Sequence, residues 1–344
     1  MEKFGYRFSF GPWNIHEGAD PFGPPVRPAR AFDDKLAVYK ELGFDAVQFH
    51  DDDAVPELDG KSPAQIRRAA RAMRKKIEGE GLVAEFVAPR LWESPLTVDG
   101  AFTSNDPRSR AYALARSKKC ADIGQEMGAN LMVLWLAREG TYLRESKDVG
   151  RATHQLLDAI NALLDYAPQL RIAVEPKPNE PMDLAYIPTM GHALALGFQS
   201  SDPSRVGVLM ESAHSILAGL DPADETGFAL AFGKLWSVHL NDQNGLKFDQ
   251  DRSFGSIDLR RAFNQARVLD ENRYYETGMV GLDVKAIRTQ PANLATKHLR
   301  NSMAAFLRLV ERVRSLDRKA MSGLIAARDY EELDWLILTH LMGK

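Results

Sequence analysis

The segment from His239 to Asp251 places an imidazole and two carboxylates directly after residues 234–239, an apolar run typical of a buried strand. Alone, Asp249 and Asp251 would indicate a turn or a solvated loop tip. Similar groups follow the other apolar runs of the chain: His50 and Asp53, Glu175 and Lys177, Glu211 and His214, and Asp283. Charged groups at the ends of buried strands are costly unless they are paired or bind a cation. The pattern therefore predicts a metal centre.

Glu175 and Lys177 lie two residues apart and project to the same side of an extended chain. One interpretation is a surface ion pair in a proline-rich loop. The other is a metal-binding carboxylate beside a lysine that polarises a substrate oxygen. The apolar strand predicted at residues 170–175 favours the second interpretation, because it places both groups at a strand end.

Two further pairs leave alternatives open. Glu211 and His214 can reach one ion if the chain turns directly after Glu211, or they can mark a helix start with a solvated histidine. His50 and Asp53 suit a general base whose tautomer is fixed by an acid, or they can form a capped turn.

These groups must be positioned by the elements before them, and the chain alternates between strand and helix patterns. Strands are predicted at residues 6–13, 45–50, 82–92, 130–135, 170–175, 205–211, 234–239 and 278–285. Helices are predicted at residues 31–43, 62–81, 106–128, 148–166, 189–198, 225–233, 258–270 and 292–316. This order predicts the α/β class and a closed (β/α)8 TIM barrel. An open doubly wound sheet is the alternative, but its ligand binds at one switch point rather than at nearly every strand end.

We expect a catalytic barrel over residues 1–318 and a helical tail over residues 319–344, because neither a linker nor a low-complexity segment interrupts the alternation. The tail is amphipathic between Glu331 and Leu341. It should therefore pack either on the barrel or on a neighbouring subunit.

Composition limits the possible partners and compartment. The net charge of −3 is spread along 344 residues that are 44% hydrophobic, so neither nucleic acid nor a membrane is an expected partner. The single cysteine, Cys120, excludes an intrachain disulfide framework and is expected to pack within a helix. We expect a cytoplasmic protein, since the chain contains neither a targeting segment nor an apolar run of membrane-spanning length.

Several motifs make the chain similar to the xylose isomerase family, in its shorter, actinobacterial-type class. They are Phe49-His-Asp-Asp-Asp53, Phe102-Thr-Ser-Asn-Asp106, Trp135-Leu-Ala-Arg-Glu-Gly140, Glu175 to Pro181, Glu211-Ser-Ala-His214 and Asn241 to Asp251. The similarity extends in order over nearly the whole chain. It implies a TIM-barrel sugar isomerase that assembles as a homodimer or homotetramer.

By this resemblance, one or two divalent cations bind per chain, in two sites that share a carboxylate. The first cation grips two substrate hydroxyls, and its ligands are Glu175, Glu211, His239 and Asp283. The second cation polarises the substrate carbonyl during a hydride shift, and its ligands are Glu211, His214, Asp249 and Asp251.

The same resemblance implies roles for the remaining candidates. His50, oriented by Asp53, assists the opening of the sugar ring, and Lys177 hydrogen-bonds the carbonyl oxygen. Trp92 and Trp135 form walls of the sugar site.

The chain departs from the family pattern at four positions that we expect to touch substrate or metal. His239 replaces a metal-binding aspartate, which favours Mn²⁺ or Co²⁺ while Mg²⁺ stays possible, because imidazole suits transition metals. His16 replaces a tryptophan of the sugar pocket, and Trp92 replaces a phenylalanine. Leu209 replaces an asparagine just before the metal-binding glutamate. The resulting ligand set of two glutamates, a histidine and an aspartate resembles that of rhamnose-isomerase and sugar-epimerase barrels.

The function expected from these residues is a metal-dependent aldose–ketose isomerase that is not specific for D-xylose. The alternative is a sugar epimerase or another enzyme of the same barrel superfamily that works through an enediolate. A catalytically inactive sugar-binding protein is disfavoured by the near-complete ligand set. A DNA-repair nuclease on the same barrel is disfavoured by the acidic charge balance.

Overall fold

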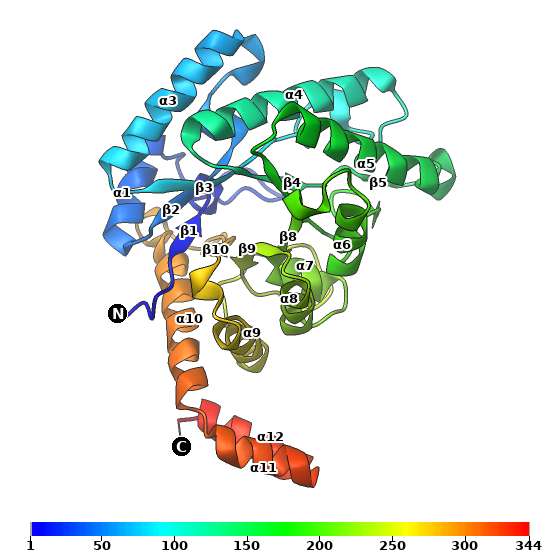
Figure 1. Ribbon diagram of the computed structural model, residues 1–344. Coiled ribbons are helices and arrows are strands. Elements are labelled where there is room, and N and C mark those ends of the chain that lie inside the picture. The colour runs from blue at the N-terminus through cyan, green and yellow to red at the C-terminus, as the bar shows by residue number, and fades with distance from the viewer. Residues whose placement is uncertain (1, 344) are drawn as a thin grey trace.

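The computed structural model describes residues 2–343 and contains a closed barrel of eight parallel strands (Figure 1). In order around the barrel the strands are β1 (Phe8–Phe10), β2 (Ala46–His50), β3 (Val83–Ala88), β4 (Leu131–Trp135), β6 (Arg171–Glu175), β8 (Val206–Glu211), β9 (Leu235–Leu240) and β10 (Val280–Leu282). β10 pairs with β1 and closes the barrel. The predicted α/β class and TIM-barrel fold are therefore confirmed, and the open doubly wound sheet is wrong.

Helices form the outer layer. The eight long helices of this layer are α1 (Phe32–Leu42), α3 (Pro63–Gly79), α4 (Pro107–Met127), α5 (Val149–Tyr166), α6 (Met190–Phe198), α8 (Pro222–Ala231), α9 (Leu259–Glu271) and α10 (Lys297–Ser315). Two short helices, α2 (Asp51–Ala54) and α7 (Ser212–Leu217), begin directly after barrel strands. A separate antiparallel pair consists of β5 (Gly140–Thr141) and β7 (Leu184–Ala185).

Local sequence signals account for several helix boundaries. Ser62 caps α3 by accepting a hydrogen bond from the backbone of Gln65, whose side chain accepts one from the backbone of Ser62. α1 and α4 end at Gly43 and Gly128, which adopt the left-handed conformation that glycine tolerates without strain.

The predicted helix bounds agree with the structure to within two residues, except at the starts of two helices. α8 begins at Pro222, before the predicted Glu225, because Asp221 caps the earlier position. α10 begins at Lys297, because residues 292–294 form a separate 3₁₀ turn.

The strand register places the chemical groups at one level of the barrel. Across neighbouring strands, Trp135 pairs with Glu175, Glu211 pairs with His239, and His239 pairs with Gly281. Because the strands are parallel, their carboxyl ends meet at the same face of the barrel.

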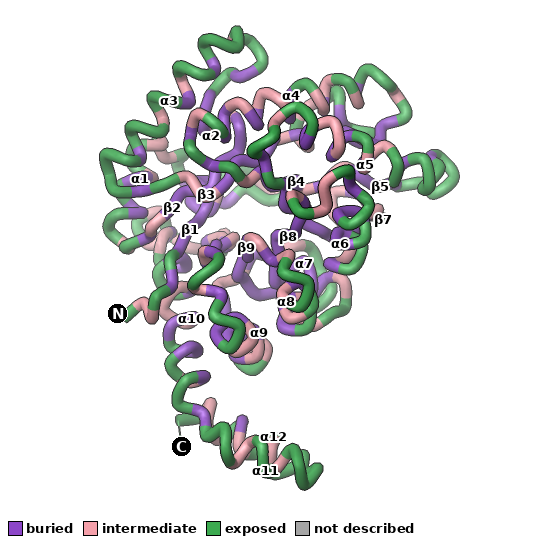
Figure 2. The backbone as a smooth tube through the Cα atoms, in the orientation of Figure 1, coloured by how far each residue is buried: buried purple, intermediate pink, exposed green. Residues whose placement is uncertain are grey.

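Apolar side chains fill the space between strands and helices, and Figure 2 shows buried strands inside a ring of helices with exposed outer faces. Cys120 lies in this core within α4, as expected, and its burial raises the pKa of the thiol. A smaller apolar cluster contains Phe86, Val133, Ala173 and Leu209. These residues alternate with the helix-facing positions of their strands, so they face the barrel interior.

The tail forms a pair of helices, α11 (Arg318–Ala327) and α12 (Tyr330–Leu341), beyond the end of α10 (Figure 1). α12 contacts the barrel helices: Asp334 pairs with Arg260 of α9, and His340 Nε2 lies 2.7 Å from the carbonyl oxygen of Arg312 in α10. Packing on the barrel, one of the two predicted alternatives, is therefore present. α11 stays largely exposed and buries no residue.

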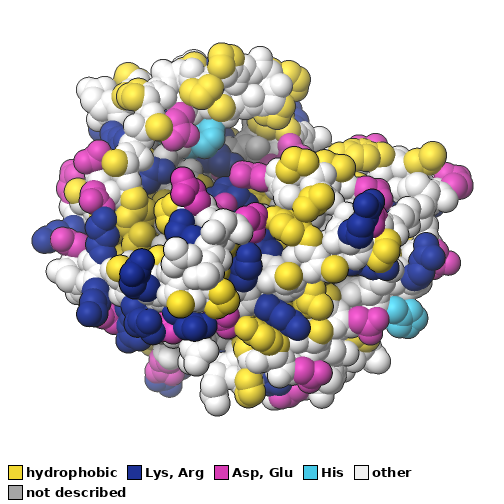
Figure 3. Space-filling view, turned by 90° about the horizontal axis from the view of Figure 1, so that it is seen from above, with side chains coloured by type: hydrophobic (Ala, Val, Ile, Leu, Met, Phe, Trp, Pro, Cys, Tyr) yellow, Lys and Arg dark blue, Asp and Glu magenta, His cyan; other side chains and the backbone are white. Residues whose placement is uncertain are grey.

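The exterior carries mixed charge. Basic and acidic side chains are interspersed on the face shown in Figure 3, in keeping with the net charge of −3. Among residues 2–343, no helix is both long and apolar enough to cross a membrane.

Candidate metal centre and active site

A cavity of about 700 Å³ opens at the carboxyl ends of the barrel strands. All the predicted site residues except Asp53 line it: His16, His50, Trp92, Trp135, Glu175, Lys177, Glu211, His214, His239, Asp249, Asp251 and Asp283. The predicted strand ends therefore meet at one place. Asp53 lies behind His50, outside the cavity lining.

The first predicted ligand group surrounds the imidazole of His239. Its Nδ1 atom lies 3.4 Å from Glu211 Oε2, 3.7 Å from Glu175 Oε1 and 3.9 Å from Asp283 Oδ2. Glu211, His239 and Asp283 offer ligand atoms that all lie within 4.8 Å of one another. The side chain of His239 therefore faces the three carboxylates rather than the hydrophobic core.

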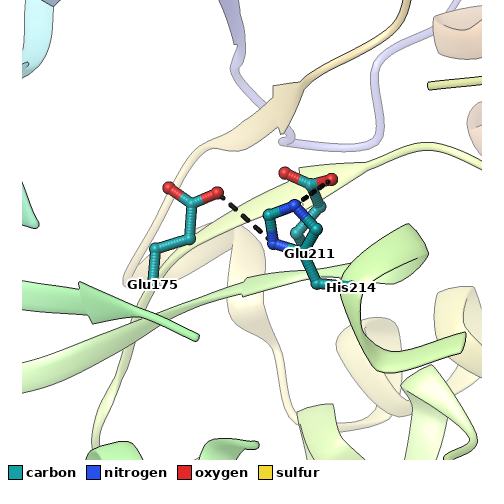
Figure 4. A group of neighbouring side chains, drawn as sticks. All are labelled: Glu175, Glu211 and His214. Carbon is teal, nitrogen blue, oxygen red and sulfur yellow. Dashed lines mark ion pairs between the residues drawn. The ribbon is translucent and has the colours of Figure 1, made fainter. Parts of the chain in front are cut away.

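The second predicted group shares Glu211 with the first. His214 Nε2 lies 3.1 Å from Glu211 Oε1 and 3.3 Å from Asp249 Oδ2, and its Nδ1 lies 3.6 Å from Glu175 Oε1. Figure 4 shows the imidazole of His214 between the carboxylates of Glu175 and Glu211. Asp251 completes the group, because ligand atoms of Glu211, Asp249 and Asp251 lie within 4.8 Å of one another.

The turn that Glu211 and His214 require is supplied by α7. Glu211 is the last residue of β8 and α7 begins at Ser212, so the first helical turn returns His214 to the strand end. The expected helix start is present, but the histidine is not solvated, since His214 is only 4% exposed. The interpretation as a solvated histidine is therefore wrong.

Three buried polar atoms fit a bound cation. His214 Nδ1, His239 Nδ1 and Asp249 Oδ1 are buried and make no hydrogen bond within residues 2–343. Buried polar atoms normally find a partner, and imidazole nitrogens with carboxylate oxygens are ligands for divalent transition metals. The residues present therefore fit one or two divalent cations.

The electrostatics of the group point the same way. Burial raises the pKa of Glu211 to about 8, and burial together with the nearby Asp249 raises that of Asp251 to about 8. Burial alone would lower the pKa of His239, but the carboxylates of Glu175 and Glu211 raise it well above its ordinary value. Without a cation the cluster therefore holds protons, which a divalent cation can replace.

Two lysines moderate the negative charge. Lys177 Nζ lies 2.9 Å from Asp249 Oδ2 and 3.2 Å from Glu180 Oε2. Lys285 pairs with Asp251, a contact that the sequence pattern did not indicate. The two ammonium groups offset part of the charge of the five predicted carboxylate ligands.

His50 contacts both an acidic and a basic side chain. Its Nδ1 lies 3.1 Å from Asp53 Oδ2, as predicted, and 2.7 Å from a guanidinium nitrogen of Arg90. The alternative of a capped turn is also realised, because His50 precedes α2 and forms a capping box with Asp53. Burial alone would raise the pKa of Asp53, but His50 and Arg90 lower it.

Three tryptophans line the cavity beside His50. The ring centroids of Trp92 and His50 lie 5.0 Å apart, and those of Trp92 and Trp135 lie 4.5 Å apart. Trp13, which was not predicted as a site residue, lies 4.2 Å from His50 and donates a 3.0 Å hydrogen bond to Asp283 Oδ1.

Asn241 was also missed as a site residue. Its Nδ2 atom donates hydrogen bonds to Glu211 Oε1 at 2.9 Å, to Asp251 Oδ1 at 3.2 Å and to the carbonyl oxygen of Asp283 at 3.0 Å. The amide of Asn241 therefore links the three chain segments that carry Glu211, Asp251 and Asp283. Asn241 directly follows β9 and begins the family motif from Asn241 to Asp251, and this position could have identified it.

For one of the four positions that depart from the family pattern, the predicted contact with substrate or metal is wrong. Leu209 lies in the apolar cluster of the barrel interior and does not line the cavity. It precedes Glu211 by two positions and so faces the same side of β8, but one layer deeper in the barrel.

These features define a TIM-barrel protein with overlapping groups of carboxylates and imidazoles that could hold a cation at the carboxyl ends of its strands. Residues 36–305 match the family described as Xylose isomerase-like TIM barrel, and the chain belongs to this family. It is 37% identical over 314 residues to the xylose isomerase of Thermus thermophilus, covering 89% of this chain and 80% of that protein. The resemblance inferred from the motifs is therefore confirmed.

Solved structures of lower identity share the fold. The D-psicose 3-epimerase of Clostridium cellulolyticum H10, determined with D-tagatose, has a TM-score of 0.63 at 14% identity, covering 89% of this chain and 99% of its own. The IOLI protein with a bound zinc atom has a TM-score of 0.61 at 14% identity, covering 90% and 99%. The fold thus includes sugar isomerases and epimerases.

Proposed function

We propose that the protein is a metal-dependent aldose–ketose isomerase that moves a hydride within an open-chain sugar. The observation that carries this proposal is the convergence of three overlapping groups of possible cation ligands, all of which include Glu211, with Lys177 beside them in one cavity. The identity of 37% to a xylose isomerase supports it.

Bound divalent cations would supply Lewis acidity that fixes substrate hydroxyls and polarises the substrate carbonyl. Lys177 uses two of its three N–H donors on Asp249 and Glu180, which leaves one for the carbonyl oxygen. Asp53 and Arg90 both contact His50 Nδ1, so Nε2 is the nitrogen that would accept or donate a proton during ring opening. Trp92 and Trp135 would exclude water from the migrating hydrogen.

We expect the enzyme not to be specific for D-xylose. His16 and Trp92, two of the departures from the family pattern, both line the cavity. An imidazole at position 16 changes the hydrogen bonds offered to sugar hydroxyls, and an indole at position 92 enlarges the apolar wall.

A sugar epimerase is the alternative, and His239 is the observation that favours it. Its place among Glu175, Glu211 and Asp283 gives the ligand set that resembles the epimerase barrels. An epimerase needs acid–base groups on both sides of one carbon, and Lys177 and the acids of the second group are the candidates for these roles.

The test is a panel of pentoses, hexoses and deoxysugars, assayed for ketose formation with Mg²⁺, Mn²⁺ or Co²⁺. An aldose deuterated at C2 should then give a ketose that keeps the label at C1, even in ordinary water. Loss of the label to solvent, or conversion of one ketose into another, would favour the epimerase or enediolate mechanism. Absence of turnover and of cation binding would contradict both functions.

A further inference from the structure

We infer that Gln48 is a positioning residue that fixes the tautomer of His239, so that His239 Nδ1 faces the cation. The inference rests on the metal centre of the proposed function. Gln48 lies in β2, is fully buried and does not line the cavity, and it was not among the candidates of the sequence analysis.

The contacts of Gln48 with Glu85 and Ser9 determine which way its side-chain amide is oriented. The carboxylate of Glu85 accepts hydrogen bonds from the hydroxyls of Ser9 and Ser237, the second at 2.9 Å. Gln48 Nε2 donates to Glu85 Oε2 at 3.1 Å and to Ser9 Oγ at 3.1 Å. A reversed amide would set its oxygen against the carboxylate, which cannot donate. The oxygen of Gln48 therefore faces His239.

This oxygen decides which nitrogen of His239 carries the proton. Gln48 Oε1 lies 3.1 Å from His239 Nε2, and an amide oxygen only accepts, so Nε2 is the donor. The lone pair of the neutral ring is then on Nδ1, which faces Glu175 and Glu211 and makes no hydrogen bond in the described part of the chain. A hydrogen bond of this kind also raises the basicity of a metal-binding imidazole.

Gly281 makes room for this contact. A Cβ atom at position 281 would lie 2.4 Å from Gln48 Nε2, 2.5 Å from the carbonyl oxygen of Val238 and 3.2 Å from His239 Cδ2. β1 and β10 separate the strands of Gln48 and His239 in the barrel order. A side chain at position 281 would therefore block the contact between amide and imidazole.

The experiment compares Gln48→Met with Ser9→Ala. Q48M keeps nearly the same shape and removes the acceptor for His239 Nε2. S9A is the matched control, because it removes a buried partner of Glu85 and of Gln48 but leaves the bond between Gln48 and His239 intact. Calorimetric titration should show Q48M binding Mn²⁺ and Co²⁺ roughly 10- to 100-fold more weakly. Its Co²⁺ absorption bands should also change, whereas S9A should resemble the unaltered protein in both measurements.

The outcomes separate the inference from the proposed function. Unchanged Mn²⁺ and Co²⁺ affinity and an unchanged Co²⁺ spectrum in folded Q48M would overturn the role of Gln48. An equal loss of affinity in S9A would also overturn it, because the effect would then belong to the Glu85 network as a whole. Failure of the unaltered protein to bind a divalent cation would instead overturn the metal centre of the proposed function.

A second measurement uses the unaltered protein and so does not depend on the folding of Q48M. In the Zn²⁺-loaded protein, long-range ¹H–¹⁵N spectra should show His239 protonated at Nε2 and metal-bound at Nδ1. Loss of these signals in His239→Gln assigns them. A proton on Nδ1 would overturn the inference.

Discussion

Trp13 joins a predicted metal ligand to a predicted acid–base residue. Its indole N–H donates a 3.0 Å hydrogen bond to Asp283, and its ring lies 4.2 Å from the imidazole of His50, measured between centroids. Trp13 follows β1, whereas Asp283 and His50 lie at the ends of β10 and β2, the two neighbours of β1. One side chain thus couples the positions of two groups from different strands.

Replacement of Trp13 by phenylalanine should keep an aromatic ring beside His50 and remove the hydrogen bond to Asp283. Groups that hold metal ligands in place commonly contribute 10- to 100-fold to metal affinity, so we expect W13F to weaken Mn²⁺ binding by about tenfold. Trp92→Phe is the matched control, because Trp92 packs against the same histidine at 5.0 Å. W92F should change the KM for sugar and leave Mn²⁺ affinity unaltered; equal losses of Mn²⁺ affinity in both variants would contradict the role of the hydrogen bond.

His239 should set the preference for the cation. The unaltered protein should be more active with Mn²⁺ or Co²⁺ than with Mg²⁺ at matched occupancy, because imidazole favours transition metals. His239→Asp should shift the ratio of activities toward Mg²⁺, and calorimetry should show the same shift in affinity. Equal activity of the unaltered protein with Mg²⁺ and Mn²⁺ would contradict this prediction.

Asp249→Asn should abolish turnover while the first site still binds a cation and sugar, since Asp249 belongs to the second ligand group alone. Calorimetry with a substrate analogue should then fall from two cations per chain to one. Glu180→Gln is the control, because Glu180 is the other carboxylate partner of Lys177 and lies outside both ligand groups. E180Q should keep both cations. Retained turnover in D249N would favour the one-metal, epimerase-like mechanism.

His298 should make the fold sensitive to mild acid. Its Nε2 lies 3.0 Å from the carbonyl oxygen of Asn14, and burial lowers the pKa of His298 to about 4. Between about pH 6.5 and 4, His298 is therefore protonated in the unfolded state but neutral in the folded state. This contribution to stability is complete above pH 6.5 and is lost as the pH falls toward 4, by roughly 3 kcal/mol at most.

Urea unfolding of the metal-free protein at several pH values can measure this effect. His298→Gln keeps a donor for Asn14 but cannot titrate, so its free energy of unfolding should fall less steeply between pH 6.5 and 4. Parallel curves for the two proteins would show that His298 does not cause the acid sensitivity.

The sequence predicts the barrel and the ligands at its strand ends for one physical reason. Buried strands must be apolar, so a charged group directly after one stands out, as Glu175 and Glu211 do. The missed residues depend on contacts between distant parts of the chain. Gln48 and His239 are 191 positions apart, and Trp13 and Asp283 are 270 apart. Neither periodicity nor local spacing encodes such pairs.

Errors in the predicted site have a local origin. Leu209 is close to Glu211 in sequence, but the alternation of side chains along β8 places it one layer deeper, inside the apolar cluster. Lys285 and Arg90 were missed because a basic side chain after a strand indicates nothing until its acidic partners are located. In the fold these partners are Asp251 for Lys285, and Asp52 and Asp53 for Arg90.

Glu211 turns one oxygen toward each ligand group, Oε1 toward His214 and Oε2 toward His239. Burial raises its pKa to about 8, so near neutrality this carboxyl group carries a proton until a cation arrives. A cation in either ligand group would have to displace that proton, and filling the second group would also displace the proton on Asp251, whose pKa is likewise raised to about 8. Cation binding is therefore coupled to proton release, and because both ligand groups share Glu211, each cation changes the affinity of the other by the same factor.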